Sequence, residues 1–505
     1  MGFLRTGAGI ALAAVTAACG GRERPPAHQA GRDSAGGVSV DPATVPGAVA
    51  LELWQLREGI TLADWMSARV EEHLERRDTA TAYDFAGAWC ARAERRTPVA
   101  GHTLERSAFF FPPPPPTGLE LPPDSQPEQL VAACTLGLVW TRAPELDSAD
   151  GAGLADSVRA ALTRAYGGTG RDTAMSFWGS AFWTHRGRFR RGMVTAISAL
   201  DAMPRPAQDS GRSPRAVLAF AFLPGSEISV DSGPGFEWRT GWTPDTLPLE
   251  RAVAVARLDT TMWLPLRRLL AEAEVPGAAR RSLEPAALSG ALGRWLGAAA
   301  ALPPPRRAAA LFVADQVLAR AGCAYVLCGA RDGARLAPLR ALGAQFTYSE
   351  LGAAWVYTRT WLSQARVLDR DSPVGQAVLL IQLDQGFDFS GTCAAGAEGF
   401  RRVIDNGERY LARVPLSPIA AEVHFLVGEA YRDVVALAHG AGLEYADSSA
   451  YTAAEPEARR RALEHYRAAI AGAPDRQVAR AAWRRAWWLL AGLPPRSVRY
   501  LCIYD

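Results

Sequence analysis

The chain is 505 residues long, which is enough for two to four domains that each bury a core. Hydrophobic residues make up 49% and charged residues 21%, values that are typical of globular proteins and exclude a largely disordered chain. The formal net charge is only +3. This balance excludes the strongly basic surface that nucleic-acid binding requires.

The N-terminus has the pattern of an export signal. Arg5 gives it a positive start, and residues 7–18 are small and apolar. This run is too short to span a bilayer, but it fits the core of a signal peptide. Residues 16–19, Thr-Ala-Ala-Cys, resemble the lipobox of bacterial lipoproteins, although Thr16 stands where that family usually has leucine.

The lipoprotein resemblance implies that Cys19 carries a membrane anchor of the palmitate type. In that family the signal peptide is removed before the cysteine, and its thiol and its new amine are acylated. Two or more acyl chains anchor a protein stably where a single chain exchanges. Gly20 follows in place of the aspartate that retains family members at the inner membrane, so we expect the outer membrane, facing the periplasm or the cell surface. Ordinary secretion, with cleavage after a small residue, is the alternative.

Changes in composition predict five segments along the chain. They are a signal peptide (1–18), the lipidated cysteine with a flexible tether (19–48), an N-terminal helical region (49–205) with a proline-rich loop (112–127), a mixed region with a β element (206–302), and a tetratricopeptide-like helical domain (303–505). The tether is predicted because Gly, Pro, Ala, Ser, Arg and Asp follow one another there without hydrophobic period.

Helices are expected over most of the N-terminal region. Thr61 is a suitable N-cap for the apolar residues that follow at helical spacing, and helical patterns return over 79–94, 130–140 and 154–166. Consecutive prolines within 112–127 adopt polyproline II and cannot join a helix or a ladder. That stretch is either a rigid loop packed by its own phenylalanines or a strip that docks into an aromatic groove.

The middle of the chain predicts a small antiparallel β element. Residues 216–222 form a short apolar run that ends at Pro224 and Gly225, and residues 227–230 alternate between polar and apolar side chains. Short runs of this kind, bounded by turn residues, are typical of strands in a hairpin.

The C-terminal third contains the pattern of a helical repeat. Residues 424–431, His-x-x-Val-Gly-x-x-Tyr, resemble the first helix of a tetratricopeptide repeat, and residues 462–466, Ala-x-x-x-Tyr, followed by Pro474, resemble its second helix and terminating proline. The connection over 440–456 is longer than in that family. Fewer than three units rarely stand alone, so helices from about Leu351 should complete the stack. The predicted fold class is mainly α, with a tetratricopeptide-like array in the C-terminal part and a small antiparallel β insertion in the middle.

The tetratricopeptide resemblance implies binding of an envelope protein or peptide in a groove between stacked helices, without catalysis. The expected groove residues are Glu429, Tyr431, Arg432, Tyr466 and Arg467. The chain is therefore interpreted as a membrane-anchored envelope scaffold or adaptor. Two alternatives are a lipoprotein that captures a glycan or peptide with an aromatic pocket and an envelope enzyme without a recognisable motif. The sequence does not indicate an oligomeric state.

Six cysteines are left once the lipidated one is set aside. An even number in an exported chain is typical of disulfides, because the periplasm and outer surface are oxidising. Pairing of neighbours predicts Cys90 with Cys134, Cys323 with Cys328, and Cys393 with Cys502, which would attach the C-terminal segment to the body. Buried free thiols that act as small hydrophobes are the alternative for each pair.

Aromatic and basic residues are interleaved shortly before the middle region. As a surface they could contact an anionic headgroup or an acidic glycan, because guanidinium pairs bidentately with phosphate and carboxylate. As packing they would place the aromatics in a core and the arginines in solvent. The residues are Trp178, Trp183, Arg186, Arg188, Arg190 and Arg191.

No catalytic residue, metal or cofactor is expected. The sequence lacks the spaced histidines of a zinc helix, the serine elbow of a hydrolase, and the glycine-rich loops that bind nucleotides. Asp384 and Asp388 lie four residues apart, either as an acid/base or metal pair on one helix face or as a solvated surface.

Overall fold

A computed structural model describes the chain over residues 61–68, 73–74, 90–99, 102–113, 115–122, 126–143, 170–177, 180–189, 192–201, 215–223, 247–274, 285–322, 333–349, 354–387, 398–441, 447–495 and 498–501. The chain divides into two compact units. One consists of residues 242–486 with 497–505, and the other of residues 5–241 with 487–496. We describe the first as the helical unit and the second as the sheet unit.

The first part of the helical unit packs helices around an apolar core. Its elements in chain order are α6 (Leu249–Ala256), α7 (Thr260–Glu274), α8 (Pro285–Ala299), α9 (Pro304–Gly322), η6 (Gly333–Leu336), α10 (Ala337–Ala341), β9 (Phe346–Ser349), β10 (Ala354–Tyr357), α11 (Thr360–Leu368) and α12 (Pro373–Asp384). The strands β9 and β10 form an antiparallel pair.

Helix α9 is the centre of this part. Almost every side chain between Ala308 and Leu318 is buried, and α6, α7, α8, α11 and α12 all pack against it. A run of alanines and large aliphatic residues allows neighbours to approach a helix from every side. The core of the first part therefore surrounds one helix that is buried on every side, with Asp315 and Gln316 as its buried polar residues.

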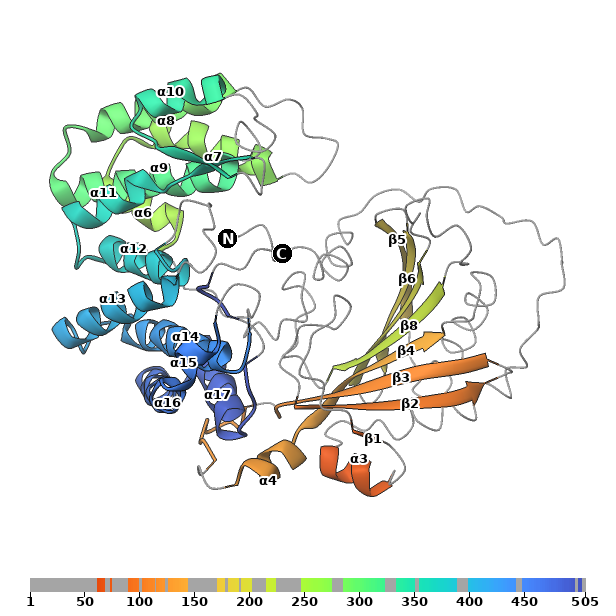
Figure 1. Cartoon of the computed structure of the whole chain (residues 1–505). Helices are drawn as coiled ribbons and strands as arrows, with labels where there is room; N and C mark the ends of the chain where they lie inside the picture. Colours follow the sequence, from red (N-terminus) through yellow and green to blue (C-terminus); the bar gives the residue numbers. More distant parts are fainter. Residues whose placement is uncertain are drawn as a thin grey trace, which may run out of the picture. The chain divides into compact units, whose positions relative to one another are not determined.

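The second part of the helical unit contains α13 (Gly399–Arg413), α14 (Ala420–Ala438), α15 (Ser449–Thr452), α16 (Glu455–Gly472) and α17 (Gln477–Leu490), whose last turn belongs to the sheet unit. Figure 1 shows these helices in blue, with α14 beside α13 and α16. Helix α13 is strongly amphipathic: Phe400, Val403 and Tyr410 are buried at helical spacing, while arginines lie on its outer face. This pattern forms a helix that covers α14 on one side.

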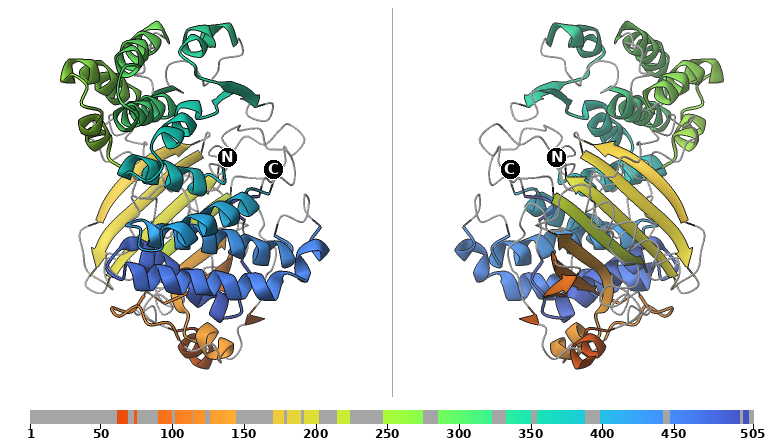
Figure 2. Two further views of the ribbon diagram at one scale, coloured as in Figure 1. Left: turned by 90° about the vertical axis from the view of Figure 1, so that its left-hand side faces the viewer. Right: turned by 90° about the vertical axis from the view of Figure 1, so that its right-hand side faces the viewer.

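The sheet unit is built on an eight-stranded antiparallel sheet. The strands are β1 (His73–Leu74), β2 (Ala91–Val99), β3 (His102–Phe111), β4 (Thr135–Ala143), β5 (Gly170–Phe177), β6 (Ser180–Phe189), β7 (Gly192–Asp201) and β8 (Arg215–Leu223), with α3 (Leu62–Ala68) and α4 (Pro127–Ala132) beside them. Their order is β1-β2-β3-β4-β8-β7-β6-β5. Two meanders, β1 to β4 and β5 to β8, therefore meet where β8 pairs with β4, and Figure 2 shows the strands side by side.

The helical prediction for residues 49–205 is wrong over most of the described part. Residues 91–94, expected to end a helix, begin β2, and residues 130–140 divide between α4 and β4. The expected helix over 154–166 lies outside the described residues. Short apolar runs of strands resemble helical runs, so periodicity did not separate the two.

Other predictions for the sheet unit agree better with the structure. Thr61 caps α3, because its hydroxyl accepts a hydrogen bond from the Asp64 amide at 3.1 Å. The described prolines of 112–116 lie in neither helix nor strand, as expected. The apolar run 216–222 is a strand, but β8 belongs to the large sheet and not to a small insertion. The small antiparallel pair is β9–β10, further along the chain, and the described chain as a whole is mainly helical.

Candidate functional site

Glycines set the close spacing of the helices around α14. A Cβ atom on Gly428 would lie 2.7 Å from a ring carbon of Tyr466 on α16, and a Cβ atom on Gly407 of α13 would clash with Val427. Only glycine therefore allows α13 and α16 to approach α14 this closely. Gly428 and Tyr466 are both residues of the predicted repeat pattern.

Helix α14 is buried along nearly its whole length. Between Ala420 and Ala438, the residues that are not buried lie on one strip that includes His424 and Tyr431, seven residues apart. Seven residues make two turns of a helix, so both side chains lie on the same face. This strip faces the side chains of α13 and α16.

Five polar side chains meet on this strip, and we call them the histidine cluster: Glu408, His424, Tyr431, Arg461 and His465. Nδ1 of His424 lies 3.0 Å from Nδ1 of His465, and Nε2 of His465 lies 3.6 Å from Glu408 Oε1. Tyr431 donates a hydrogen bond to Glu408 at 2.7 Å, and Arg461 also donates to Glu408. The cluster thus connects α13, α14 and α16.

The surroundings of the two histidines keep both rings neutral. Burial lowers the pKa of His424, and burial together with His424 and Arg461 lowers the pKa of His465 to about 4. Burial pushes the pKa of Glu408 upward, but hydrogen bonds from Tyr431 and Arg461 outweigh it and leave the pKa below its ordinary value. An ionised Glu408 only accepts hydrogen bonds, so it favours the proton on Nε2 of His465 and leaves Nδ1 to accept from His424.

Among the described residues, the histidine cluster is not a group that could hold a metal ion. The described residues contain no group of three or more His, Cys, Asp or Glu side chains that could hold a metal ion. The guanidinium of Arg461 lies over the Tyr431 ring at 5.6 Å, and that ring stacks on His465. The side chains of Arg461, Tyr431 and His465 therefore pack against one another inside the cluster.

A second polar site lies where residues 498–501 pack onto the helical unit. We call these residues the docked segment. Both carboxylate oxygens of Asp433 accept hydrogen bonds from the backbone amides of Arg499, at 2.9 Å, and Tyr500, at 2.7 Å. The amide of Gly399 donates to the Tyr500 carbonyl at 2.9 Å, and Leu501 forms a β-bridge with Glu398.

The Arg499 side chain reaches two further carboxylates. It is hydrogen-bonded to Asp384 at the end of α12, and its second terminal nitrogen lies 3.8 Å from Glu429 on α14. Glu429 also pairs with Arg485 of α17 at 3.1 Å and accepts a hydrogen bond from Tyr466 at 2.7 Å. Asp384, Glu429 and Asp433 therefore surround one arginine of the docked segment.

Two glycines make room for the docked segment. A Cβ atom on Gly399 would lie 2.9 Å from the Tyr500 carbonyl oxygen, and one on Gly386 would lie 3.1 Å from the Tyr500 ring. Gly386 also has a positive φ of 63°. Any other residue at either position would push the segment away. We use the name segment site for Asp384, Gly386, Gly399, Glu429 and Asp433.

The two buried carboxylates of the segment site differ in their ionisation. Burial opposes the charge of Glu429, but Arg485, Arg432 and Arg499 outweigh burial and lower its pKa to about 2. Burial raises the pKa of Asp433 to about 7, although the amides of Arg499 and Tyr500 act in the opposite direction. Glu429 is thus the permanent negative charge that Arg499 meets.

The predicted partner groove is wrong for three of its five residues. Glu429, Arg432 and Tyr466 are buried between helices, Tyr431 is half-buried in the histidine cluster, and Arg467 alone is exposed. The reason is that α14 is covered by α13, α16 and the docked segment, so its repeat-pattern residues pack inward. Asp384, interpreted from the sequence either as half of an acid/base or metal pair with Asp388 or as part of a solvated surface, pairs with Arg499, and Asp388 lies outside the described residues.

Sequence reasoning missed Asp433 and Arg499. No local spacing connects them, because they are 66 residues apart in the chain. The histidines of the cluster appeared in the sequence only as scattered residues without metal-ligand spacing. A signal for the cluster was the seven-residue separation of His424 and Tyr431 on one helix.

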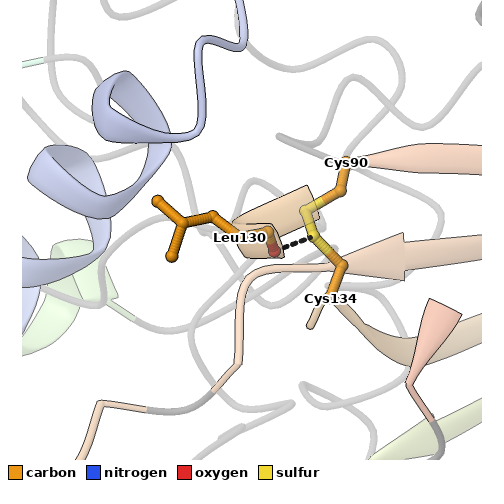
Figure 3. Close-up of a disulfide and its surroundings, with 3 residues drawn as sticks. All are labelled: Cys90, Leu130 and Cys134. Carbon is orange, nitrogen blue, oxygen red and sulfur yellow. Dashed lines mark hydrogen bonds between the residues drawn. A yellow bond between two sulfur atoms is a disulfide. The ribbon is translucent and has the colours of Figure 1, made fainter. Parts of the chain in front are cut away.

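One of the three predicted disulfides lies within the described residues. Cys90 and Cys134 are bonded, with their Cα atoms 6.3 Å apart, as neighbour pairing predicted. Figure 3 shows this bond, with the Cys134 sulfur near the Leu130 carbonyl oxygen at 3.6 Å. It connects the start of β2 to the start of β4. Cys323, Cys328, Cys393 and Cys502 lie outside the described residues.

The remaining predicted sites are described only in their backbone or not at all. Trp183, Arg186 and Arg188 lie on strand β6, while Trp178, Arg190 and Arg191 fall outside the described residues. Cys19 and the whole signal region also fall outside them. Within the described part of the chain, no helix is long and apolar enough to cross a membrane.

Comparisons with known proteins give this chain no relatives. The chain matches no protein-family model, no curated protein and no solved structure. The geometry of the two polar sites is therefore the feature of the molecule that points to a function.

Proposed function

We propose that this chain is an exported, lipid-anchored protein of the bacterial envelope that binds a protein or peptide partner through its C-terminal helices. The observation that carries the proposal is the docked segment. Helices α12, α13 and α14 hold an extended stretch of polypeptide by its backbone amides and carbonyls, and they bind its arginine with carboxylates. Recognition of an extended peptide uses these same interactions.

We further propose that α13, α14, α16 and α17 form a tetratricopeptide-like array. The close contact between Gly428 and Tyr466, together with the end of α16 at Gly472 just before Pro474, supports this proposal. In such arrays, small residues let neighbouring helices approach and a proline stops each hairpin. The exposed Arg467 of α16 is the predicted groove residue that a partner can reach.

The anchor at Cys19 is part of the same proposal. Its support is the lipobox-like residues 16–19 and the apolar run before them. Cells that express the full chain and grow with a palmitate analogue should label the mature protein. A Cys19→Ala chain should lose the label and leave the membrane fraction. An unlabelled chain, or unchanged fractionation of Cys19→Ala, would contradict a lipid anchor at Cys19.

A photo-crosslinking experiment tests partner binding. A photoreactive amino acid at Arg467 of the full-length exported chain should capture one envelope protein in stoichiometric amount. The matched control places the same amino acid at Leu264, an exposed position on α7, where we expect no capture. Capture from neither position, together with binding of an envelope glycan by the same chain, would overturn the adaptor function in favour of substrate capture.

A further inference from the structure

We infer that the segment site binds an extended peptide of a partner protein, with an arginine followed by an aromatic residue, and that the docked segment is its resident occupant and competitor. The inference rests on the proposed function and adds the chemistry of the partner to it. The segment site hydrogen-bonds the backbone of the docked segment, surrounds its arginine with carboxylates, and leaves space for its aromatic ring.

The site recognises an extended backbone. Asp433 accepts hydrogen bonds from two consecutive amides, at 2.9 Å and 2.7 Å, and Gly399 donates to the next carbonyl at 2.9 Å. The β-bridge between Glu398 and Leu501 continues this pairing. These contacts are made to the main chain, so they accept any extended peptide in the correct register.

The site selects arginine by charge. The guanidinium lies between Asp384 and Glu429, and Asp433 lies beneath the backbone of the same residue. The planar, permanently charged guanidinium donates a hydrogen bond to Asp384 and lies at ion-pair distance from Glu429, and a neutral side chain cannot balance these two charges. An occupant without a cation at this position would leave Asp384 unpaired.

The site selects an aromatic residue by shape. The Tyr500 side chain is buried, its ring lies against Gly386, and the guanidinium of Arg499 lies 5.5 Å from the centre of the ring. A Cβ atom on Gly386 would approach the ring to 3.1 Å. The space beside Gly386 thus fits a flat ring directly after the arginine.

The docked segment can leave without unfolding a helix. Pro494 and Pro495 separate it from α17, because proline lacks the amide hydrogen that would continue a helix. The Asp384 side chain remains 30% exposed and that of Arg499 18% exposed, so water reaches the ion pair. A peptide of the same chemistry can therefore compete for the site from solution.

Peptide exchange in a cleavable full-length chain tests the inference. The chain carries Cys502→Ser and a protease site inserted between Pro495 and Val498, and it is cut after folding. A fluorescent peptide with the sequence of residues 497–505, also with Cys502→Ser, should bind the cut protein and not the uncut protein. The same peptide with Arg499→Ala should bind about a hundredfold more weakly, as expected for loss of one partner of a buried ion pair. A Val498→Ala peptide serves as the matched control and should bind nearly as well as the parent.

Two results would overturn the inference. One is a cut protein that keeps its circular dichroism spectrum and binds no peptide. The other is equal binding of the parent and Arg499→Ala peptides. If the cut protein unfolds, the uncut full chain with Arg499→Ala replaces it, and the fluorescent peptide should bind that chain about tenfold more tightly than the unaltered chain. No gain in binding there also overturns the inference.

The two proposals fail in different ways. Peptide exchange without any envelope protein captured at Arg467 would leave the segment site intact as a peptide site and remove the adaptor function. Capture at Arg467 without peptide exchange would leave the adaptor function and remove the segment site from it.

Discussion

The two parts of the helical unit differ in how many charged side chains they bury and in how these are paired. The part from α6 to α12 buries an apolar core around α9, with one closely matched ion pair between Asp315 and Arg359. The part from α13 to α17 instead buries connected charges, including Glu429, Asp433 and Arg485. Removing charges from water costs more than a simple ion pair returns, unless further hydrogen bonds compensate. In the proposed function, these connected charges of the second part bind the arginine of a peptide.

In the first part, the charge of Asp315 is balanced by Arg359, and Gln316 also donates to it at 3.3 Å. Both side-chain nitrogens of Arg359 that face Asp315 donate to it, at 2.5–3.1 Å, and the Asp315 side chain is fully buried. Burial raises the pKa of Asp315, and Arg359 opposes that rise. No other described charge is positioned to replace Arg359.

The largest expected effect is therefore that of Arg359→Ala. It should lower the free energy of unfolding by about 3–5 kcal/mol, because it leaves a buried carboxylate without its partner. Urea denaturation measures the change. Arg485→Ala in the second part should cost clearly less, because Glu429 keeps Arg432 and Arg499.

An exposed pair provides the control. Arg268 and Glu272 form an ion pair on the surface of α7, and Arg268→Ala should leave the urea midpoint unchanged within error. If Arg359→Ala proved as mild as Arg268→Ala, or Arg485→Ala as costly as Arg359→Ala, the contrast between the two parts would disappear.

The next largest effect should be acid sensitivity of the second part. The pKa of His465 is about 4 in the folded chain and near 6.5 when unfolded, so the unfolded chain binds the extra proton between these values. The stability from neutral His465 is thus complete above pH 6.5 and is lost as the pH falls toward 4. We expect this histidine contribution to fall by on the order of 2 kcal/mol, measured by denaturation of the chain and of a histidine-free chain at several pH values, because the raised pKa of Asp433 acts in the opposite direction and equally in both chains.

A histidine-free chain separates this effect from carboxylate titration. His424→Gln with His465→Gln should be less stable at pH 7 but should lose less stability between pH 6.5 and pH 5, where Glu408 stays ionised. An identical slope in both chains over that interval would show that the histidine cluster does not titrate as described.

The smallest of the three effects concerns helix spacing. Gly428→Ala should lower the free energy of unfolding by about 1–2 kcal/mol, because its methyl group would press on the Tyr466 ring, and this strain outweighs the higher helix propensity of alanine. Gly297→Ala on α8 is the matched control. Its Cβ has nothing within 4 Å, so it should gain up to about 1 kcal/mol. Thermal denaturation of both variants compares them, and a stabilising Gly428→Ala would contradict the close contact of α14 and α16.

Local patterns predicted the helical unit well and the sheet unit poorly. Gly428, Tyr466 and Pro474 are local signals of a tight helix pair, and the helices formed where these signals lie. The strands β4 and β7 gave no such signal, since a short apolar run does not by its periodicity distinguish a strand from a buried helix. The pairing of β8 with β4 depends on contacts between segments about 80 residues apart, which no short window contains.

Some features of the candidate sites can be predicted from the sequence, and others follow only from the tertiary structure. The sequence alone determined the bond between Cys90 and Cys134, because neighbour pairing depends only on chain order, and it is the only basis of the proposed anchor at Cys19. Only the tertiary structure showed that α14 is covered, which turned the expected groove residue Glu429 into a buried partner of Arg499. Charge pairing over long separations depends on where folded helices meet, and that position is a property of the packed molecule as a whole.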